Sequence, residues 1–138
     1  VYDWEAVFGI KIEIRQLDPS QFSYFLKQEK DNMYYWGWGA DYAHPQNFLE
    51  VLFGTGTTYN IGGYSNTHFD ALLRQAAATT DEAASFALYQ QAEQLLVNDV
   101  ACIPLWTGKN MQLVQSYVKG YALNALGQVA LNQVYILK

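Results

Sequence analysis

The apolar pattern near the N-terminus constrains the fold of this chain more than any other feature. Residues 10–15 alternate isoleucine with charged side chains, which is typical of a strand with one buried face. Asp18 and Pro19 suit the N-cap and first position of a helix whose apolar stripe falls within residues 22–26. Residues 33–38 are apolar throughout, as in a strand that is covered on both faces. A strand, a helix and a strand in about thirty residues predict a βαβ unit with parallel strands, and hence an α/β fold.

The middle of the chain predicts a pair of packed helices. Asn66 can cap a helix over residues 67–78, and Asp81 can cap a second helix over residues 82–99. Because the connection between them is short, the two helices should form an αα-hairpin. The side chains expected to face inward are Phe69, Leu72 and Leu73 in the first helix, and Phe86, Tyr89, Ala92 and Leu96 in the second.

Shorter elements flank this hairpin. Pro45 should begin a helix that Gly54 ends, and the Gly- and Thr-rich residues 54–63 should form a loop. The apolar segments that predict further strands are residues 101–106, 111–118 and 134–137.

Composition excludes some classes of function. The net charge is −5, whereas phosphate binding needs a basic face, so a nucleic-acid partner is not expected. Cys102 is the only cysteine, so the chain has no internal disulfide and no cysteine-based zinc site. Residues 1–8 read as a helix with Gly9 at its C′ position, without an initiator Met or a signal peptide. We therefore expect a fragment of a longer protein, long enough for one domain.

The segment from Trp36 to Tyr42 lies where the second predicted strand ends. In an open α/β sheet, ligands collect in the crevice beyond the carboxyl ends of the strands. Asp41 is a carboxylate in an aromatic setting at this junction, and such a group can take an ammonium ion out of water when the two pair well. The sequence therefore predicts a binding site for a positively charged group, an amine first of all. The alternative is that Asp41 caps the turn or the helix that begins at Pro45.

Two tryptophans of the same segment extend this hypothesis. Trp36 and Trp38 are two residues apart on the predicted strand, so their side chains should share one face. Trp106 is a candidate for the same layer. These rings form either part of a core or the apolar wall of a ligand cleft. A glycan-binding module, with the three rings as stacking platforms, is an alternative class of function.

The sequence gives little support to catalysis or metal binding. It has no Gly-x-Ser-x-Gly motif, and nothing aligns a pair of carboxylates for glycoside cleavage. Cys102 lies in an apolar run, where a thiol is usually inert. Asp41, His44 and His68 are conceivable metal ligands, but their spacing supports a site poorly. We expect His44 in a turn and His68 in an exposed first helical turn, and we expect no enzyme, cofactor or metal.

The segment Trp38-Gly39-Ala40-Asp41-Tyr42, followed by Pro45 and Asn47-Phe48, resembles the signature of periplasmic oligopeptide- and dipeptide-binding proteins. These are solute-binding proteins of family 5, which serve ATP-driven (ABC) importers. The resemblance extends from about Phe8 to Lys138. The further segments that carry it are Tyr64 to Leu73, Leu88 to Leu96, Ile103 to Leu105, and Val118 to Tyr121.

This resemblance implies a periplasmic-binding-protein-like fold of two lobes that close over a peptide by a hinge motion. The chain resembles the last quarter of such a protein. Residues 1–125 would then form the C-terminal α/β lobe, and residues 126–138 a strand segment that returns towards the first lobe. The partner strands of that segment would lie outside the chain, so we expect it to be frayed or paired with a neighbouring chain.

The resemblance also implies a site. In the family, the Asp of the signature pairs with the α-ammonium group of the peptide, and a Trp just before it lines the cleft; these positions are Asp41 and Trp38. The ligand-binding residues expected here are Trp36, Trp38, Gly39, Ala40, Asp41 and Tyr42.

The implied ligand is a peptide or other small solute, and the implied partner of the full-length protein is the membrane permease of an ABC importer. The implied location is the periplasm or, for a lipoprotein, the cell surface. Within the same family, a nickel complex or a sugar is an alternative ligand.

Overall fold

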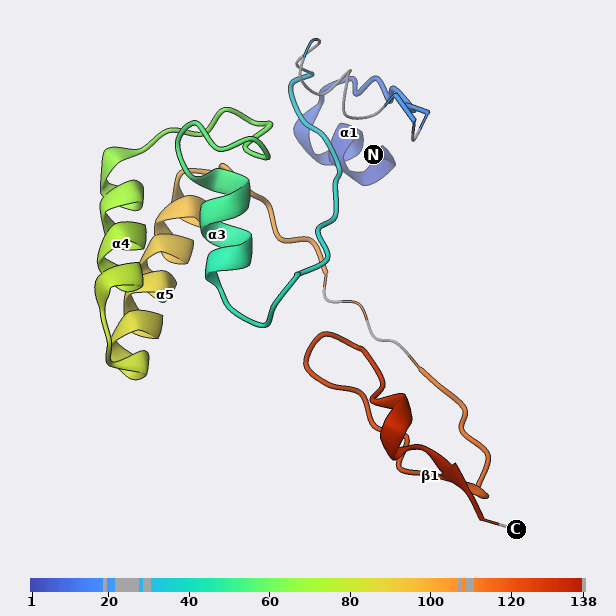
Figure 1. Cartoon of the computed structure of the whole chain (residues 1–138). Helices are drawn as coiled ribbons and strands as arrows, with labels where there is room; N and C mark the ends of the chain where they lie inside the picture. The colour runs from blue at the N-terminus through green and yellow to red at the C-terminus, as the bar shows by residue number, and fades with distance from the viewer. Residues whose placement is uncertain (19, 22–27, 29–30, 107, 109–110, 138) are drawn as a thin grey trace. The chain divides into compact units, whose positions relative to one another are not determined.

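The computed structural model describes residues 1–18, 20–21, 28, 31–106, 108 and 111–137 (Figure 1). The chain forms two compact units, Val1–Tyr35 and Trp36–Lys138. None of the helices in the described part is long and apolar enough to cross a membrane.

The first unit contains helix α1 (Tyr2–Phe8). The helix ends because Gly9 adopts a left-handed conformation (φ 63°), and the Gly9 N–H donates to the carbonyl of Glu5 at 2.9 Å. The predicted C′ glycine is therefore confirmed. The Glu5 carboxylate in turn accepts a hydrogen bond from the backbone N–H of Ile12 at 2.8 Å, which connects α1 to the chain that follows it.

The predicted βαβ unit is wrong. Neither residues 10–15 nor residues 33–38 form a strand, and Ile10 and Ile14 are 51% and 74% exposed. The helix expected between them, with its apolar stripe in residues 22–26, lies outside the described residues. An alternating pattern shows which face of a strand would be buried, but a strand exists only where a neighbouring strand supplies the ladder of hydrogen bonds. No strand of the described residues pairs with these two segments.

The second unit contains helices α3 (Gln46–Phe53), α4 (Thr67–Ala78) and α5 (Glu82–Asn98). Figure 1 shows α4 and α5 side by side, and α3 packs against both of them. The predicted αα-hairpin is confirmed. The Asn66 side chain accepts hydrogen bonds from the backbone N–H groups of His68 and Phe69, and Asp81 accepts one from Ala84. These caps satisfy N–H groups that the first turn of each helix leaves without a helical partner.

The core of the second unit lies between these helices. Its buried apolar residues are Leu49, Phe69, Leu72, Leu73, Ala76, Tyr89, Ala92 and Leu96. Phe69 is fully buried, and Phe86 is half-buried against the cluster. The Ser85 hydroxyl, which the apolar pattern does not include, is buried and donates to the carbonyl oxygen of Ala76 at 2.8 Å. This bond joins α4 to α5 and satisfies the buried hydroxyl.

The C-terminal residues contain β1 (Val118–Lys119), the 3₁₀ turn η1 (Leu131–Gln133) and β2 (Tyr135–Ile136). The strands pair antiparallel, with Val118 opposite Ile136 and Lys119 opposite Tyr135. The final segment therefore has a partner inside the chain, and the expectation that it is frayed or paired with a neighbouring chain is wrong.

The other strand predictions hold only in part. Of residues 111–118 only Val118 belongs to a strand, and residues 101–106 form none. Ile103 and Leu105 are exposed rather than packed between neighbouring strands. An apolar run without a ladder partner does not become a strand, so these segments fail for the same reason as residues 10–15.

Candidate ligand-binding site

The signature segment leads directly into helix α3. Pro45 occupies the N-cap position, and the backbone N–H groups of Phe48 and Leu49 donate to its carbonyl oxygen at 3.1 and 2.9 Å. Asp41 therefore lies just before a helix N-terminus. The prediction that Asp41 follows a strand is wrong, because residues 33–38 form no strand. The helix expected at Pro45 is confirmed, and the positive end of its dipole favours a carboxylate nearby.

Asn47, in the first turn of α3, is the centre of the site. Its side chain is 2% exposed, and its Oδ1 accepts hydrogen bonds from the Trp38 Nε1–H at 2.9 Å and from the Asp41 backbone N–H at 3.1 Å. Its Nδ2 donates to Asp41 Oδ2 over 3.5 Å, a long bond. One buried amide thus holds the ring of Trp38 and the backbone of Asp41 together.

The carboxylate of Asp41 is exposed, and it accepts from the Asn47 side chain rather than from a backbone N–H of the turn or of α3. The alternative role for Asp41, capping the turn or the helix that begins at Pro45, is therefore wrong. The imidazole of His44 takes part of that role, because its Nδ1 accepts a hydrogen bond from the Gln46 backbone N–H at 3.2 Å. Asp41 keeps an exposed carboxylate, and its one bond from Asn47 leaves further lone pairs that can accept from a cation.

The two tryptophans of the segment meet although they are not on a strand. The ring centroids of Trp36 and Trp38 are 5.8 Å apart in an edge-to-face arrangement, and both side chains are half-buried. Tyr59 adds a third ring, 4.9 Å from Trp38 and 6.5 Å from Trp36. These three residues form an aromatic cluster beside Asn47 and Asp41. Trp106 is 69% exposed, and its membership of this layer stays a prediction.

Tyr59 belongs to the loop that the glycines and threonines of residues 54–63 predict. The Asn60 side chain fixes the loop: its Nδ2 donates to the carbonyls of Gly54 and Tyr64 at 3.0 and 2.7 Å, and its Oδ1 accepts from the Tyr64 N–H. Sequence reasoning missed Tyr59, since no local pattern shows that this loop returns to Trp38.

Tyr42 and the two small residues complete the predicted set. The Tyr42 hydroxyl donates to Gln46 Oε1 at 2.8 Å, and Gln46 Nε2 donates to Glu50 Oε2 at 2.7 Å, so Tyr42 is tied to the side of α3. Gly39 is exposed, with nothing near the place where a Cβ would stand, and Ala40 is half-buried. The structure thus joins Trp36, Trp38, Asp41 and Tyr42 through α3 and the aromatic cluster, while Gly39 and Ala40 link them along the chain.

His44 attaches this segment to the helical core. Its ring lies 5.2 Å from the ring of Tyr89, edge to face, and 5.6 Å from that of Phe86. Burial raises the pKa of the Tyr89 phenol, and the carboxylate of Glu50 raises it further. The signature segment therefore rests on α5 through aromatic contacts, which fixes where α3 begins.

No group of three potential metal ligands occurs among the residues that the structure describes. His44 is engaged with Gln46 and two aromatic rings, and His68 is exposed in the first turn of α4. Cys102 is half-buried, and burial followed by the nearby charge of Glu93 raises the pKa of its thiol. A raised pKa disfavours the reactive thiolate.

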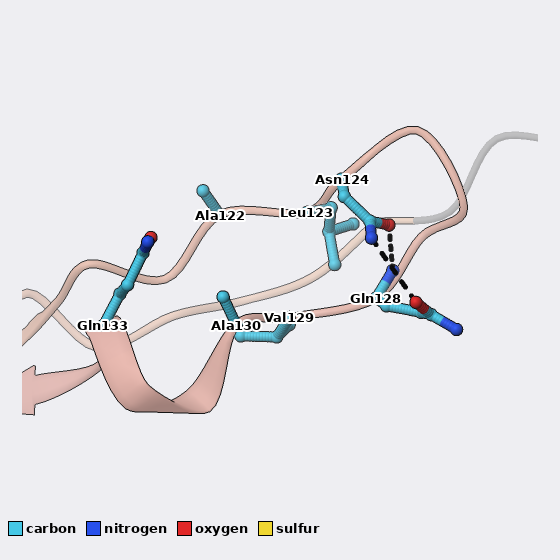
Figure 2. A pocket seen from close by; sticks show the side chains of 7 residues that line it. All are labelled: Ala122, Leu123, Asn124, Gln128, Val129, Ala130 and Gln133. Atoms are coloured by element: carbon cyan, nitrogen blue, oxygen red, sulfur yellow. Dashed lines mark hydrogen bonds between the residues drawn. The ribbon is translucent and has the colours of Figure 1, made fainter. Parts of the chain in front are cut away.

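A surface hollow lies beside the C-terminal strand pair of β1 and β2 (Figure 2). The Asn124 side chain accepts hydrogen bonds from the N–H groups of Leu126 and Gln128, both at 2.9 Å, and so closes the loop beside it. The residues that line the hollow are Ala122, Leu123, Asn124, Gln128, Val129, Ala130 and Gln133. Since none of them is charged, this hollow offers less to an ammonium group than Asp41 does.

Comparison with known proteins shows the family of the chain. No family model matches the chain. The dipeptide-binding protein DppE of Bacillus subtilis is 31% identical over 126 residues, which are 89% of this chain and 22% of the relative. The periplasmic oligopeptide-binding protein OppA of Escherichia coli is 29% identical over 136 residues, 98% of this chain and 25% of the relative. YgiS of Escherichia coli, described as a probable deoxycholate-binding periplasmic protein, is 28% identical over 97% of this chain and 25% of its own length.

The chain belongs to the family of periplasmic oligopeptide- and dipeptide-binding proteins. It spans about a quarter of the length of these relatives.

Proposed function

We propose that this chain is part of the C-terminal lobe of an extracytoplasmic solute-binding protein that delivers peptides to the permease of an ABC importer. One observation carries the site: the Asp41 carboxylate is exposed beside the half-buried Trp38, and the buried Asn47 holds both residues. The names of two relatives, a dipeptide-binding and an oligopeptide-binding protein, support a peptide as the ligand. OppA and YgiS are both named periplasmic proteins, which supports a location outside the cytoplasm.

The chemistry of this arrangement suits the end of a peptide. A protein that accepts many peptides must hold what all of them share, which is the main chain and its charged amino terminus. Asp41 supplies a charge of the required sign, and the aromatic cluster of Trp36, Trp38 and Tyr59 supplies an apolar surface beside it. When a second lobe closes over the site and excludes water, the attraction between ammonium and carboxylate increases.

The same proposal assigns the two parts of the chain. Residues 1–125 belong to the C-terminal lobe, and residues 126–138 return towards the first lobe. The pairing of β2 with β1 is compatible with this path, because the pairing occupies only Tyr135 and Ile136 of the last segment.

Isothermal titration calorimetry on the full-length protein tests the proposed ligand. Trialanine with a free amino terminus should bind, and N-acetyltrialanine should bind far more weakly, since acetylation removes the ammonium group. Loss of one partner of a desolvated ion pair costs about 3–5 kcal/mol, which corresponds to about two to four decades in affinity. Equal binding of the two peptides would show that the protein does not read the ammonium group.

Substitution of Asp41 by Asn tests the assigned residue. Asp41→Asn should weaken trialanine at least about tenfold and leave N-acetyltrialanine nearly unchanged, because only the charged ligand loses its partner. Glu82→Gln removes the same charge from an exposed position in the first turn of α5 and serves as the matched control. If both variants weaken trialanine equally, net charge rather than Asp41 determines affinity.

A different solute is the second candidate, favoured by the similarity to YgiS and by the aromatic cluster. In that case Trp38 and Tyr59 would contact an apolar ligand, and peptides would not bind. Titration with deoxycholate, a nickel complex and an oligosaccharide panel separates these ligands from peptides. Binding of oligosaccharides without competition from peptides would favour a glycan-binding module.

A further inference from the structure

We infer that Asn47 is a positioning residue that holds the aromatic wall and the carboxylate of the ligand site at a fixed separation. The inference rests on the proposed function. It adds to the proposed site a residue that does not touch the ligand. Asn47 is buried in the first turn of α3, while Trp38 is half-buried and Asp41 exposed. The residue that joins the two is therefore screened from the ligand.

The hydrogen bonds of Asn47 explain how it acts. Its Oδ1 receives two donors, the indole N–H of Trp38 at 2.9 Å and the main-chain N–H of Asp41 at 3.1 Å. A carbonyl oxygen has two lone pairs, so both are used. The first bond fixes the plane of the Trp38 ring, and the second fixes the backbone from which the Asp41 side chain extends.

The position of Asn47 in α3 restricts the motion of the amide that accepts these two hydrogen bonds. The Asn47 backbone N–H donates to the carbonyl of His44 at 3.1 Å, and the next residues of α3 bond to Pro45. Leu49, two residues on, is part of the buried core. An amide fixed in a helix whose other face is buried loses little freedom when it binds two further groups, so it can orient them at small entropic cost.

The test compares two Asn→Ala variants of the full-length protein. Asn47→Ala removes the acceptor of both N–H groups, whereas Asn66→Ala removes the cap of α4. The hydrogen bonds of that cap are with His68, Phe69 and Asp99. Calorimetry gives the ratio of the affinities for trialanine and N-acetyltrialanine. This ratio should fall about tenfold in Asn47→Ala and stay at the wild-type value in Asn66→Ala, although both variants unfold at lower temperature.

A spectroscopic measurement tests the positioning without any ligand. In a ¹H–¹⁵N spectrum, the indole N–H signal of Trp38 is identified by its loss in Trp38→Phe. We expect this signal to move and to exchange faster with solvent in Asn47→Ala, but not in Asn66→Ala. An unchanged Trp38 signal in Asn47→Ala, or an equal fall of the affinity ratio in both variants, would overturn the inference.

If Asn47→Ala does not fold, Asn47→Asp tests the positioning role of Asn47 instead. The carboxylate of this variant still accepts from Trp38 and from the Asp41 backbone, but it places a second carboxylate beside that of Asp41 where the Asn47 Nδ2 donor stood, so the affinity ratio is not used for this variant. The Trp38 signal should be retained, and its loss would contradict the role given to Asn47. If the wild-type protein itself does not distinguish the two peptides, the proposed function fails, whereas the Trp38 signal still decides on the positioning.

Discussion

Replacement of Val100 by glycine should stabilise the protein, which is the reverse of what a Val→Gly change usually does. Val100 follows α5 and has φ 55°, and it is the only non-glycine residue of the described part with a positive φ. Its N–H donates to the carbonyl of Val97, and the N–H of Ala101 donates to that of Leu96. This pair of bonds is a Schellman motif, in which the left-handed position is usually glycine.

The magnitude follows from three contributions. A residue with a Cβ pays about 1–2 kcal/mol in the left-handed conformation, and a β-branched residue such as Val100 belongs at the upper end of that range. Glycine removes this strain but loses about 0.5–1 kcal/mol through its greater freedom in the unfolded chain. The Val100 side chain is 68% exposed, so its removal sacrifices little burial. The net stabilisation should be about 0.5–1 kcal/mol.

Hydrogen exchange of the amides in the last two turns of α5 measures the effect, because it reports the free energy of local opening. Val97→Gly is the matched control, since it makes the same change three residues earlier, inside α5. It should destabilise the helix by about 0.5–1 kcal/mol through propensity and lost contacts. If Val100→Gly lowers the opening free energy as Val97→Gly does, the left-handed conformation of Val100 costs nothing and the reasoning fails.

Two further predictions concern the C-terminal hairpin and pH. Gly120→Ala should abolish the pairing of β1 with β2, because Gly120 has φ 72° and a Cβ there would overlap the carbonyl oxygen of Gln133. Gly127→Ala, with φ 73° but open space around it, should keep the pairing. Hydrogen exchange of the Leu137 N–H, which donates to the carbonyl of Tyr117, reports whether the strands are paired. Burial, and then a 2.7 Å hydrogen bond to Asp99, raise the pKa of Tyr64 to about 12. The fold favours the protonated phenol, so this contribution is complete below the unfolded pKa of about 10 and disappears between about pH 10 and about pH 12. Asp99→Asn should lower the folded-state pKa of Tyr64, so that the loss of stability ends at a lower pH. Urea unfolding midpoints measured across this pH range test this. If the midpoints of the variant decline over the same pH range as those of the wild type, Asp99 does not raise the pKa of Tyr64.

The helical hairpin could be predicted because its signals are local. Asn66 and Asp81 precede α4 and α5 in sequence and bond to backbone N–H groups two or three residues further on. The predicted start of each helix is therefore confirmed, and α5 ends one residue earlier than predicted, at Asn98. The 3.6-residue period likewise selected Phe69, the fully buried residue at the centre of the core.

The strands could not be predicted from local pattern, because pairing depends on residues far away in sequence. Each of the two strands contains two residues, and fifteen residues lie between β1 and β2. The paired residues Lys119 and Tyr135 are thus 16 apart in residue number. The strong alternation of residues 10–15 gives no strand, while the weak pattern at Val118 does. A ladder partner, rather than the apolar pattern, decides which segment forms a strand.

The candidate site was predictable to the extent that it is one continuous segment. Residue type alone makes Trp36, Trp38 and Asp41 candidates for a ligand site. The structure brings the two rings and the carboxylate to one place. Tyr59 enters from a loop that bends back, which no local pattern reveals. Asn47 belongs to the segment that resembles the family signature, but neither its burial nor its two acceptor bonds can be deduced from an asparagine in a helix.

The short sequence distances within the site tie ligand binding to the stability of the helices. Asn47 reaches Trp38 and Asp41, nine and six positions away, only while α3 is formed. Helix α3 is short, and it depends on packing against α4 and α5 because isolated helices of this length are marginal in water. Loss of packing around Leu49 would therefore free the Asn47 side chain. The separation between the Trp38 ring and the Asp41 carboxylate would then no longer be fixed. Conversely, a ligand that binds both groups selects the state in which α3 is packed, and so stabilises the hairpin by mass action.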